Sequence, residues 1–307
     1  MLFSVVMIDL DQLRIFHAVC EARSFTRAAQ AVHLTQPGIS KHIRQLEEHY
    51  GLPMFDRLGR RVELTAAGAE LYQATRRIMQ AVGDADRRIA DLQGLRSGTV
   101  ALGTSFLIGV YTLPQRLAAF RNLHPEITVT LEIALSKKIF ARVLDGKMDL
   151  GLVTYKIEDP HLELHEFMRD ELVAIAPPGH RWAHRRRVHP RELAGETLLM
   201  AARGAGTRAV LEERLARMGI TPSAVLEFGN LEGVKRAVEA GLGVSVQARS
   251  CVEREIAAGY LVMARLAEMD TTLPSYLVRR RDRHLSNAAR AFAELMGVKM
   301  GQRATAR

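Results

Sequence analysis

Two helical segments near the start of the chain are separated by only two residues, His33 and Leu34. Apolar residues recur at helical spacing on both sides of this connection. Ser24 is a favourable N-cap for the first helix, and Thr35 and Pro37 supply a cap and an early-turn proline for the second. A connection this short leaves room only for a helix-turn-helix.

A further helical segment precedes this pair, and a β-hairpin pattern follows it. Two short segments, 52–55 and 61–64, flank a loop that contains two arginines, Arg57 and Arg60. This arrangement is typical of a small β-wing with a basic tip. The sequence therefore predicts a winged helix-turn-helix domain over residues 7–65.

Residues 66–95 have the pattern of one long linker helix. Its apolar residues recur with alternating steps of four and three, which is the repeat of a coiled-coil seam. A helix of about 29 residues is a rod of roughly 43 Å, long enough to separate two domains and to pair with a second copy. Burial in the core of one globular domain is the alternative. The expected dimerisation residues are Leu71, Ile78, Val82, Ile89 and Leu92.

From residue 97 to about residue 300 the pattern changes to alternating strands and helices, which predicts a two-lobed, doubly wound α/β domain with mainly parallel strands. Strands are expected at 99–103, 127–133, 150–153, 172–176, 197–200, 224–228 and 243–246, and helices at 113–121, 138–145, 207–218, 231–240 and 251–257. A proline-glycine break at 177–180 suggests that lobe 1 comprises about 97–171 and 271–300, and lobe 2 about 172–270. The chain as a whole is predicted to belong to the α/β class.

The 307-residue chain is 48% hydrophobic and 25% charged, a composition that excludes wholesale disorder. Cys20 and Cys251 are its only cysteines, so neither a disulfide framework nor a cysteine zinc site is indicated. The sequence has no signal-peptide pattern at its start and no apolar run of about 18 residues. We therefore expect a cytoplasmic protein that does not associate with membranes.

The net charge of +9 favours polyanionic partners in general. It does not show where such a partner would bind, because residues 1–65 hold eight Lys/Arg and seven Asp/Glu, a balance of only +1. The positions of individual side chains are therefore more informative than the total charge.

The polar face of the second helix of the pair is chemically suited to the major groove of double-stranded DNA. Glutamine can pair with adenine, lysine and arginine with guanine or phosphate, and serine with phosphate oxygens. Arginines on the wing would meet the DNA backbone or a narrow minor groove. Spacing alone equally allows a solvated helix face beside a charged loop. The candidate DNA contacts are Gln36, Pro37, Ser40, Lys41, Arg44, Arg57, Arg60 and Arg61.

Polar residues also stand at the strand-to-helix junctions of the second half. Ligands of such folds bind at the carboxyl ends of the strands, and the amides at helix N-termini favour an anion. Arg208 would add a bidentate donor. Each residue alone is more often just a helix cap, so the prediction rests on four caps that converge at the carboxyl edge of the sheets. The candidate effector-binding residues are Thr104, Ser105, Ser136, Gly206, Thr207, Arg208 and Asn230.

Catalytic and cofactor motifs are not evident. The sequence has no G-x-S-x-G and no G-x-x-x-x-G-K-[ST], and its Gly241-Leu242-Gly243 run precedes an expected strand. Two histidine pairs, 161/165 and 180/184, lack an obvious third metal ligand. We expect no enzyme activity, no catalytic residue, no metal and no cofactor. The competing classes are a cytoplasmic solute-binding protein and an α/β enzyme-like protein with an accessory helix-turn-helix.

The N-terminal third resembles the winged helix-turn-helix of LysR-type bacterial transcriptional regulators. The resemblance is carried by LRIFHAV at 13–19, SFTRAA at 24–29, LTQPGISKHI at 34–43, LEE at 46–48, FDR at 55–57 and LTAAG at 64–68. It implies base contacts from Gln36, Pro37 and Lys41. It also implies phosphate contacts from Thr35, Ser40 and His42, and a minor-groove contact from Arg60. Gly38 departs from the family, in which many relatives carry a bulkier residue at this position.

The family resemblance also covers the order of the three regions. It implies a DNA-binding domain, a dimerising linker helix and an effector domain of two α/β lobes like those of periplasmic binding proteins. The run GAGTR at 204–208 is similar to branches that sense anionic metabolites, including regulators of carbon fixation. The expected protein is a sequence-specific transcriptional regulator controlled by a small anionic effector. Its other expected partners are its own copies, as a dimer or a dimer of dimers (a homotetramer), and RNA polymerase if it activates transcription.

Overall fold

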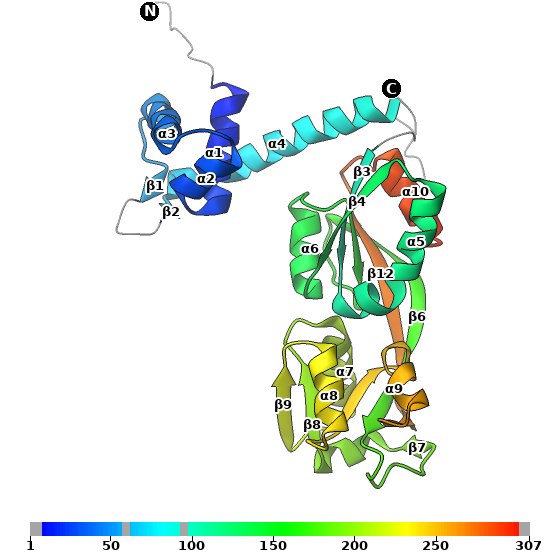
Figure 1. Cartoon of the computed structure of the whole chain (residues 1–307). Helices are drawn as coiled ribbons and strands as arrows, with labels where there is room; N and C mark the ends of the chain where they lie inside the picture. The colour runs from blue at the N-terminus through cyan, green and yellow to red at the C-terminus, as the bar shows by residue number, and fades with distance from the viewer. Residues whose placement is uncertain (1–7, 57–61, 93–97, 301–307) are drawn as a thin grey trace, which may run out of the picture. The chain divides into compact units, whose positions relative to one another are not determined.

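The computed structural model describes residues 8–56, 62–92 and 98–300. The chain divides into two compact units, Met1–Arg87 and Arg88–Arg307, whose elements are labelled in Figure 1. No helix in the described residues is long and apolar enough to cross a membrane.

The N-terminal unit begins with α1 (Leu10–Ala22), α2 (Phe25–Ala31) and α3 (Gln36–Tyr50). The predicted caps are present: Ser24 Oγ accepts from Arg27 N at 3.3 Å, and Thr35 Oγ1 accepts from Gly38 N at 3.3 Å. These bonds satisfy amides that have no acceptor within the helix. The helix-turn-helix is therefore confirmed. Its core is formed by Ile15, Phe16, Val19, Ala28, Ala29, Ile39, Ile43 and Leu46.

The wing is a two-stranded antiparallel hairpin of β1 (Phe55–Asp56) and β2 (Glu63–Leu64), in which Phe55 pairs with Leu64. The ring of Phe55 lies 5.4 Å from that of Phe16, so the hairpin is joined to the helical core through aromatic packing. The wing arginines predicted to contact DNA, Arg57, Arg60 and Arg61, lie outside the described residues.

One long helix, α4 (Ala66–Leu92), follows the wing. Thr65 caps it by accepting from Gly68 N at 3.0 Å. Of the expected seam residues, Leu71 packs against the helix-turn-helix core of its own chain, and Val82 is half-buried. Ile78 is 41% exposed and Ile89 61% exposed. The side chain of Leu92 lies outside the described residues.

The C-terminal unit contains two lobes that share long strands. Lobe 1 has the strand order β4-β3-β5-β12-β6, in which β3 (Gly98–Thr104) pairs in parallel with β4 (Ile127–Ile133) and β5 (Leu150–Val153). The strands β12 (Thr272–Arg280) and β6 (Leu162–Ala176) pair antiparallel. The helices α5 (Leu113–Leu123) and α10 (Asn287–Leu295) cover one face of this sheet and α6 (Ser136–Leu144) covers the other (Figure 1).

Lobe 2 is built on the second half of β6, which pairs antiparallel with β10 (Ser245–Ala248) and β11 (Val262–Leu266). A parallel pair, β8 (Thr197–Ala201) and β9 (Ala224–Phe228), lies beside them through a bridge from Leu198 to Val244. The short β7 (Arg187–Val188) pairs in parallel with β11. The helices of this lobe are α7 (Gly206–Arg217), α8 (Leu231–Glu239) and α9 (Glu253–Ala257).

The mainly parallel arrangement expected from the sequence applies only to part of the sheets. The pairs β3–β4, β3–β5, β8–β9 and β7–β11 are parallel, but β6 and β12, which link the lobes, are antiparallel. The predicted strand 172–176 is only the buried end of β6. Half of the first ten residues of β6 are charged and most are half-buried, so the apolar alternation that predicts a strand is interrupted there.

Candidate functional site

The polar face of α3 points away from the helical core. Gln36, Pro37, Lys41 and Arg44 are exposed, whereas Ser40 is half-buried. Gln36 Nε2 donates to Ser40 Oγ at 3.0 Å, which places the two side chains one turn apart on the same face. The described part of the expected DNA-reading face is thus brought together on one helix and is open to solvent.

Three residues are expected at phosphates. Ser40 accepts from Gln36 as described above, and Thr35 and His42 have distinct surroundings. Thr35 is exposed, and its hydroxyl oxygen accepts from the Gly38 amide, which leaves the hydroxyl hydrogen available for a phosphate oxygen. His42 is half-buried, and its Nδ1 is buried without a hydrogen-bond partner among the described residues.

A cavity of about 180 Å³ lies between the two lobes of the C-terminal unit. Five of the seven predicted effector residues line it: Ser105, Ser136, Gly206, Thr207 and Asn230. They come from both lobes and stand where strands end and helices begin, as the junction argument predicts. The apolar part of the wall is formed by Phe106, Leu107, Ile133, Leu135 and Leu231.

Three hydroxyl groups in this wall have no hydrogen-bond partner among the described residues. They belong to Ser105, Ser136 and Thr154, which are 5%, 0% and 1% exposed. A buried polar group without a partner is costly, so native proteins rarely retain one without a reason. Three of them at one small cavity indicate a polar ligand. Thr154 was not predicted, although it directly follows the expected strand 150–153.

The cavity has no charged side chain in its described wall. Its electrostatic character comes from backbone dipoles, because residues at the N-termini of α6, α7 and α8 line it. Asn230 caps α8 by accepting from Gly233 N at 2.9 Å. Helix N-termini and hydroxyl donors together suit an oxyanion.

Two of the predicted effector residues do not line the cavity. Thr104 is fully buried, and its hydroxyl donates to the Ser105 carbonyl oxygen at 3.1 Å. The guanidinium of Arg208 is engaged elsewhere: it donates to Glu212 at 2.7 Å, to Glu227 at 2.6 Å and to the Ala201 carbonyl oxygen at 2.7 Å. These donors of Arg208 hold α7, β8 and β9 together, and its role toward a ligand stays a prediction.

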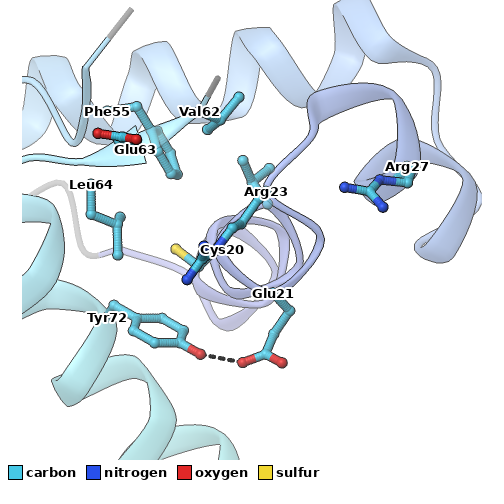
Figure 2. Close-up of a pocket in the computed structure, with 10 residues that line it drawn as sticks. Cys20, Glu21, Arg23, Arg27, Phe55, Val62, Glu63, Leu64 and Tyr72 are labelled. Carbon is cyan, nitrogen blue, oxygen red and sulfur yellow. Dashed lines mark hydrogen bonds between the residues drawn. The ribbon is translucent and has the colours of Figure 1, made fainter. Parts of the chain in front are cut away.

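A larger hollow of about 800 Å³ lies in the N-terminal unit, between α1, β2 and the start of α4 (Figure 2). The Tyr72 hydroxyl donates to Glu21 across it. Burial, and then this bond, raise the pKa of Tyr72. Burial also raises the pKa of Cys20 to about 12, so this thiol is not a reactive thiolate at neutral pH. No residue of α3 lines the hollow, so it is separate from the face expected to contact DNA.

Comparison with known proteins agrees with both halves of the chain. The bacterial regulatory helix-turn-helix protein family, lysR, matches residues 10–69, and the LysR substrate binding domain matches residues 93–300. The chain is 34% identical to the RuBisCO operon transcriptional regulator of Allochromatium vinosum, over 94% of this chain and 95% of the relative. It is 32% identical to the HTH-type transcriptional regulator CbbR of Rhodospirillum rubrum, with the same coverage.

Solved structures show the same fold. A full-length OxyR variant from Pseudomonas aeruginosa has a TM-score of 0.73 at 20% identity, covering 94% of this chain and 95% of that one. Full-length CbnR complexed with its target DNA has a TM-score of 0.66 at 22% identity, covering 94% and 99%. With two family matches over most of its length and relatives above 30% identity, the chain belongs to the LysR family of DNA-binding transcriptional regulators.

Proposed function

We propose that this regulator controls a RuBisCO operon and that a small anionic metabolite in the interlobe cavity sets its activity. The cavity supports the part of the proposal that concerns the effector. It combines three helix N-termini with three hydroxyl groups that have no hydrogen-bond partner among the described residues. The operon half is supported by relatives named as RuBisCO operon transcriptional regulators, which match the chain over 94% of its length.

The donors that the cavity offers support an anionic effector. Ser105, Ser136 and Thr154 each have a hydroxyl hydrogen to donate, and the helix N-termini add backbone amides and positive dipole ends. A carboxylate or phosphate group satisfies several such donors at once. The volume of about 180 Å³ restricts the ligand to a small metabolite.

The DNA-binding form is proposed to be a homodimer, or a pair of dimers, that functions in the cytoplasm. Exposed Ile78 and Ile89 on α4 supply an apolar surface for a second copy of the same helix. Two copies would place two α3 helices about one DNA turn apart, or a multiple of it, on a pseudo-palindromic site. RNA polymerase is the proposed further partner if the protein activates transcription.

Fluorescence anisotropy of the full-length protein tests the DNA half. The probe is the DNA upstream of the RuBisCO operon of the source organism, measured against excess random DNA. We expect binding that survives the competitor. Gln36→Ala and Lys41→Ala should each lower discrimination by roughly 1–3 kcal/mol. Arg14→Ala, an exposed α1 residue that pairs with Asp11, is the matched control and should leave discrimination unchanged. The proposed target would be contradicted if random competitor DNA and added salt abolished binding to this probe as readily as binding to unrelated DNA.

Thermal denaturation tests the effector half. Inorganic phosphate, small carboxylates and phosphate monoesters are added separately to the wild type and to Ser136→Ala. We expect at least one anion to raise the melting temperature of the wild type, because a ligand that binds the folded state stabilises it. Ser136→Ala should respond less. Stabilisation by neutral polyols alone would contradict an anionic effector.

A further inference from the structure

The two lobes are also joined beside the cavity, by a segment of lobe 1 that enters lobe 2. Leu107 is 2% exposed and belongs to the hydrophobic core of lobe 2, and Phe106 and Tyr111 pack against that core. The segment continues as a π-helical turn, Ile108–Thr112. Such turns are rare and change the direction in which side chains point, and they frequently occur at functional sites.

The side chain of Tyr111 reaches α8 of lobe 2, where its hydroxyl donates to Glu232 Oε1. The same carboxylate oxygen lies 3.0 Å from Lys235 Nζ. Lys235 is only 2% exposed, and its ammonium group lies 5.0 Å from the centre of the Tyr111 ring. The ring of Tyr111 therefore contacts the buried ammonium group of Lys235, and its hydroxyl bonds to Glu232, which pairs with the same lysine.

The cation is fully engaged within lobe 2. Lys235 Nζ lies 2.7 Å from Glu255 Oε1 and donates to the Cys251 carbonyl oxygen at 3.0 Å. Burial alone would lower the pKa of Lys235, but the bonds to Glu255, Tyr111 and Glu232 outweigh it and raise the pKa. Burial and the Glu232 bond raise the pKa of Tyr111 as well. Both groups therefore stay protonated at neutral pH, and the network keeps its donors.

Each partner of the interlobe bond belongs to a segment that also lines the cavity. Ser105, Phe106 and Leu107 line one side and lead into the turn that holds Tyr111. Asn230 and Leu231 line the other side and immediately precede Glu232. Neither Tyr111 nor Glu232 lines the cavity itself.

We propose that the Tyr111–Glu232 hydrogen bond is a latch that holds the lobes closed and positions the N-terminus of α8 as a wall of the cavity. Breaking it frees Glu232 from lobe 1 and removes the restraint on both lining segments. A ligand that bridges the cavity favours the latched arrangement, because it binds that arrangement more tightly than the open one. The latch itself is argued from contacts within the chain, and only its use in regulation rests on the proposed function.

Hydrogen exchange of the full-length protein, without any added ligand, tests the latch. The reporters are the amides of Gly109, bonded to Ser105 O at 2.9 Å, and Val234, bonded to Asn230 O at 3.3 Å. Tyr111→Phe removes only the hydroxyl, and Glu232→Gln weakens the acceptor. We expect exchange at both reporters to rise roughly tenfold in each variant. Because both changes act on the same bond, the double variant should show little increase beyond that of Tyr111→Phe alone.

Two controls separate a latch from general destabilisation. Tyr276→Phe removes a half-buried tyrosine hydroxyl from lobe 1 and should leave both reporters unchanged. The amides of the buried end of β6, 172–176, should keep their protection in every variant. Unchanged exchange at Gly109 and Val234 would overturn the proposal, and so would a rise that extends equally to β6. Neither result depends on an anion binding to the cavity, so failure of the latch is distinguishable from failure of the proposed function.

Discussion

Gly206 and Thr154 approach each other across the interlobe cavity so closely that a Cβ atom at residue 206 would lie less than 3 Å from Thr154 Oγ1. The same atom would lie 3.1 Å from Ser136 Oγ. Gly206 belongs to lobe 2, whereas Thr154 and Ser136 belong to lobe 1. Residue 206 therefore has to be glycine for the lobes to close to this distance.

Gly206→Ala is expected to separate the lobes at the cavity and to lower the free energy of unfolding by about 1–3 kcal/mol, the usual cost of overpacking. Thermal denaturation measures the effect. Gly195→Ala is the matched control, because a Cβ atom at that exposed glycine meets nothing within 4 Å. Adding Thr154→Ala to Gly206→Ala should restore part of the loss. Equal melting temperatures for Gly206→Ala and Gly195→Ala would show that the lobes do not close as described.

The unpartnered hydroxyls of the cavity predict opposite effects on stability and on binding. Ser136→Ala and Thr154→Val remove hydroxyls that have no hydrogen-bond partner among the described residues. We expect an unchanged or higher melting temperature without ligand, because a buried unpaired polar group costs roughly 1–3 kcal/mol. The affinity for a stabilising anion should fall by about tenfold, the effect of one lost hydrogen bond.

Ser275→Ala is the control for this pair. Ser275 is fully buried in β12, its hydroxyl also has no partner among the described residues, and it does not line the cavity. It should match Ser136→Ala in stability and leave anion affinity unchanged. If all three variants lost anion affinity to the same extent, the cavity hydroxyls would have no specific part in binding.

The sequence alone predicted those features that depend on residues close to one another along the chain. Thr35 and Asn230 cap their helices as expected, since a cap depends only on residues within the first turn. The same reasoning placed Ser105 and Ser136 at one edge, because strand-to-helix junctions of one sheet meet there.

The sequence did not predict contacts between side chains that are distant along the chain. Arg208 lies on α7, and Glu227, which accepts from it, lies 19 residues away on the strand β9, so no local pattern predicts this contact. The first half of β6 was missed for a related reason. Charged residues interrupt the apolar pattern there, and some of them are paired across strands, as Glu163 of β6 is with Arg279 of β12.

Arg208→Ala is expected to destabilise lobe 2 rather than to act through a ligand. The side chain is only 4% exposed, and its loss leaves the Ala201 carbonyl oxygen without its donor. We expect a loss of about 1–3 kcal/mol in unfolding free energy. Arg217→Ala on the same helix is the matched control, because that residue is 74% exposed and pairs with Glu213 four residues before it. It should cost about 0–1 kcal/mol, as exposed ion pairs do.

Urea denaturation of both variants distinguishes these roles. The Arg208→Ala midpoint should be lower than that of Arg217→Ala, and anion stabilisation should persist in Arg208→Ala. If Arg208→Ala had wild-type stability and did not respond to the anion, Arg208 would instead be inferred to bind the effector.

Acid stability should depend on Glu192, which organises the turn Pro190–Gly195. Arg185 donates to both of its carboxylate oxygens, at 2.6 and 2.8 Å, and the amide of His189 adds a third bond at 3.0 Å. The Arg185 hydrogen bond is the main cause that lowers the pKa of Glu192 to about 2.

Because the folded-state pKa lies below the ordinary value of 4.5, Glu192 stabilises the fold above pH 4.5, and this contribution is lost as the pH falls toward 2. Melting temperatures measured from pH 6 to pH 3 should therefore fall more steeply for the wild type than for Glu192→Gln, with the two curves converging at the acid end. Glu253→Gln, at a carboxylate that is 66% exposed, should follow the wild type. Parallel curves for the wild type and Glu192→Gln would show that the Arg185 pair does not contribute to acid sensitivity.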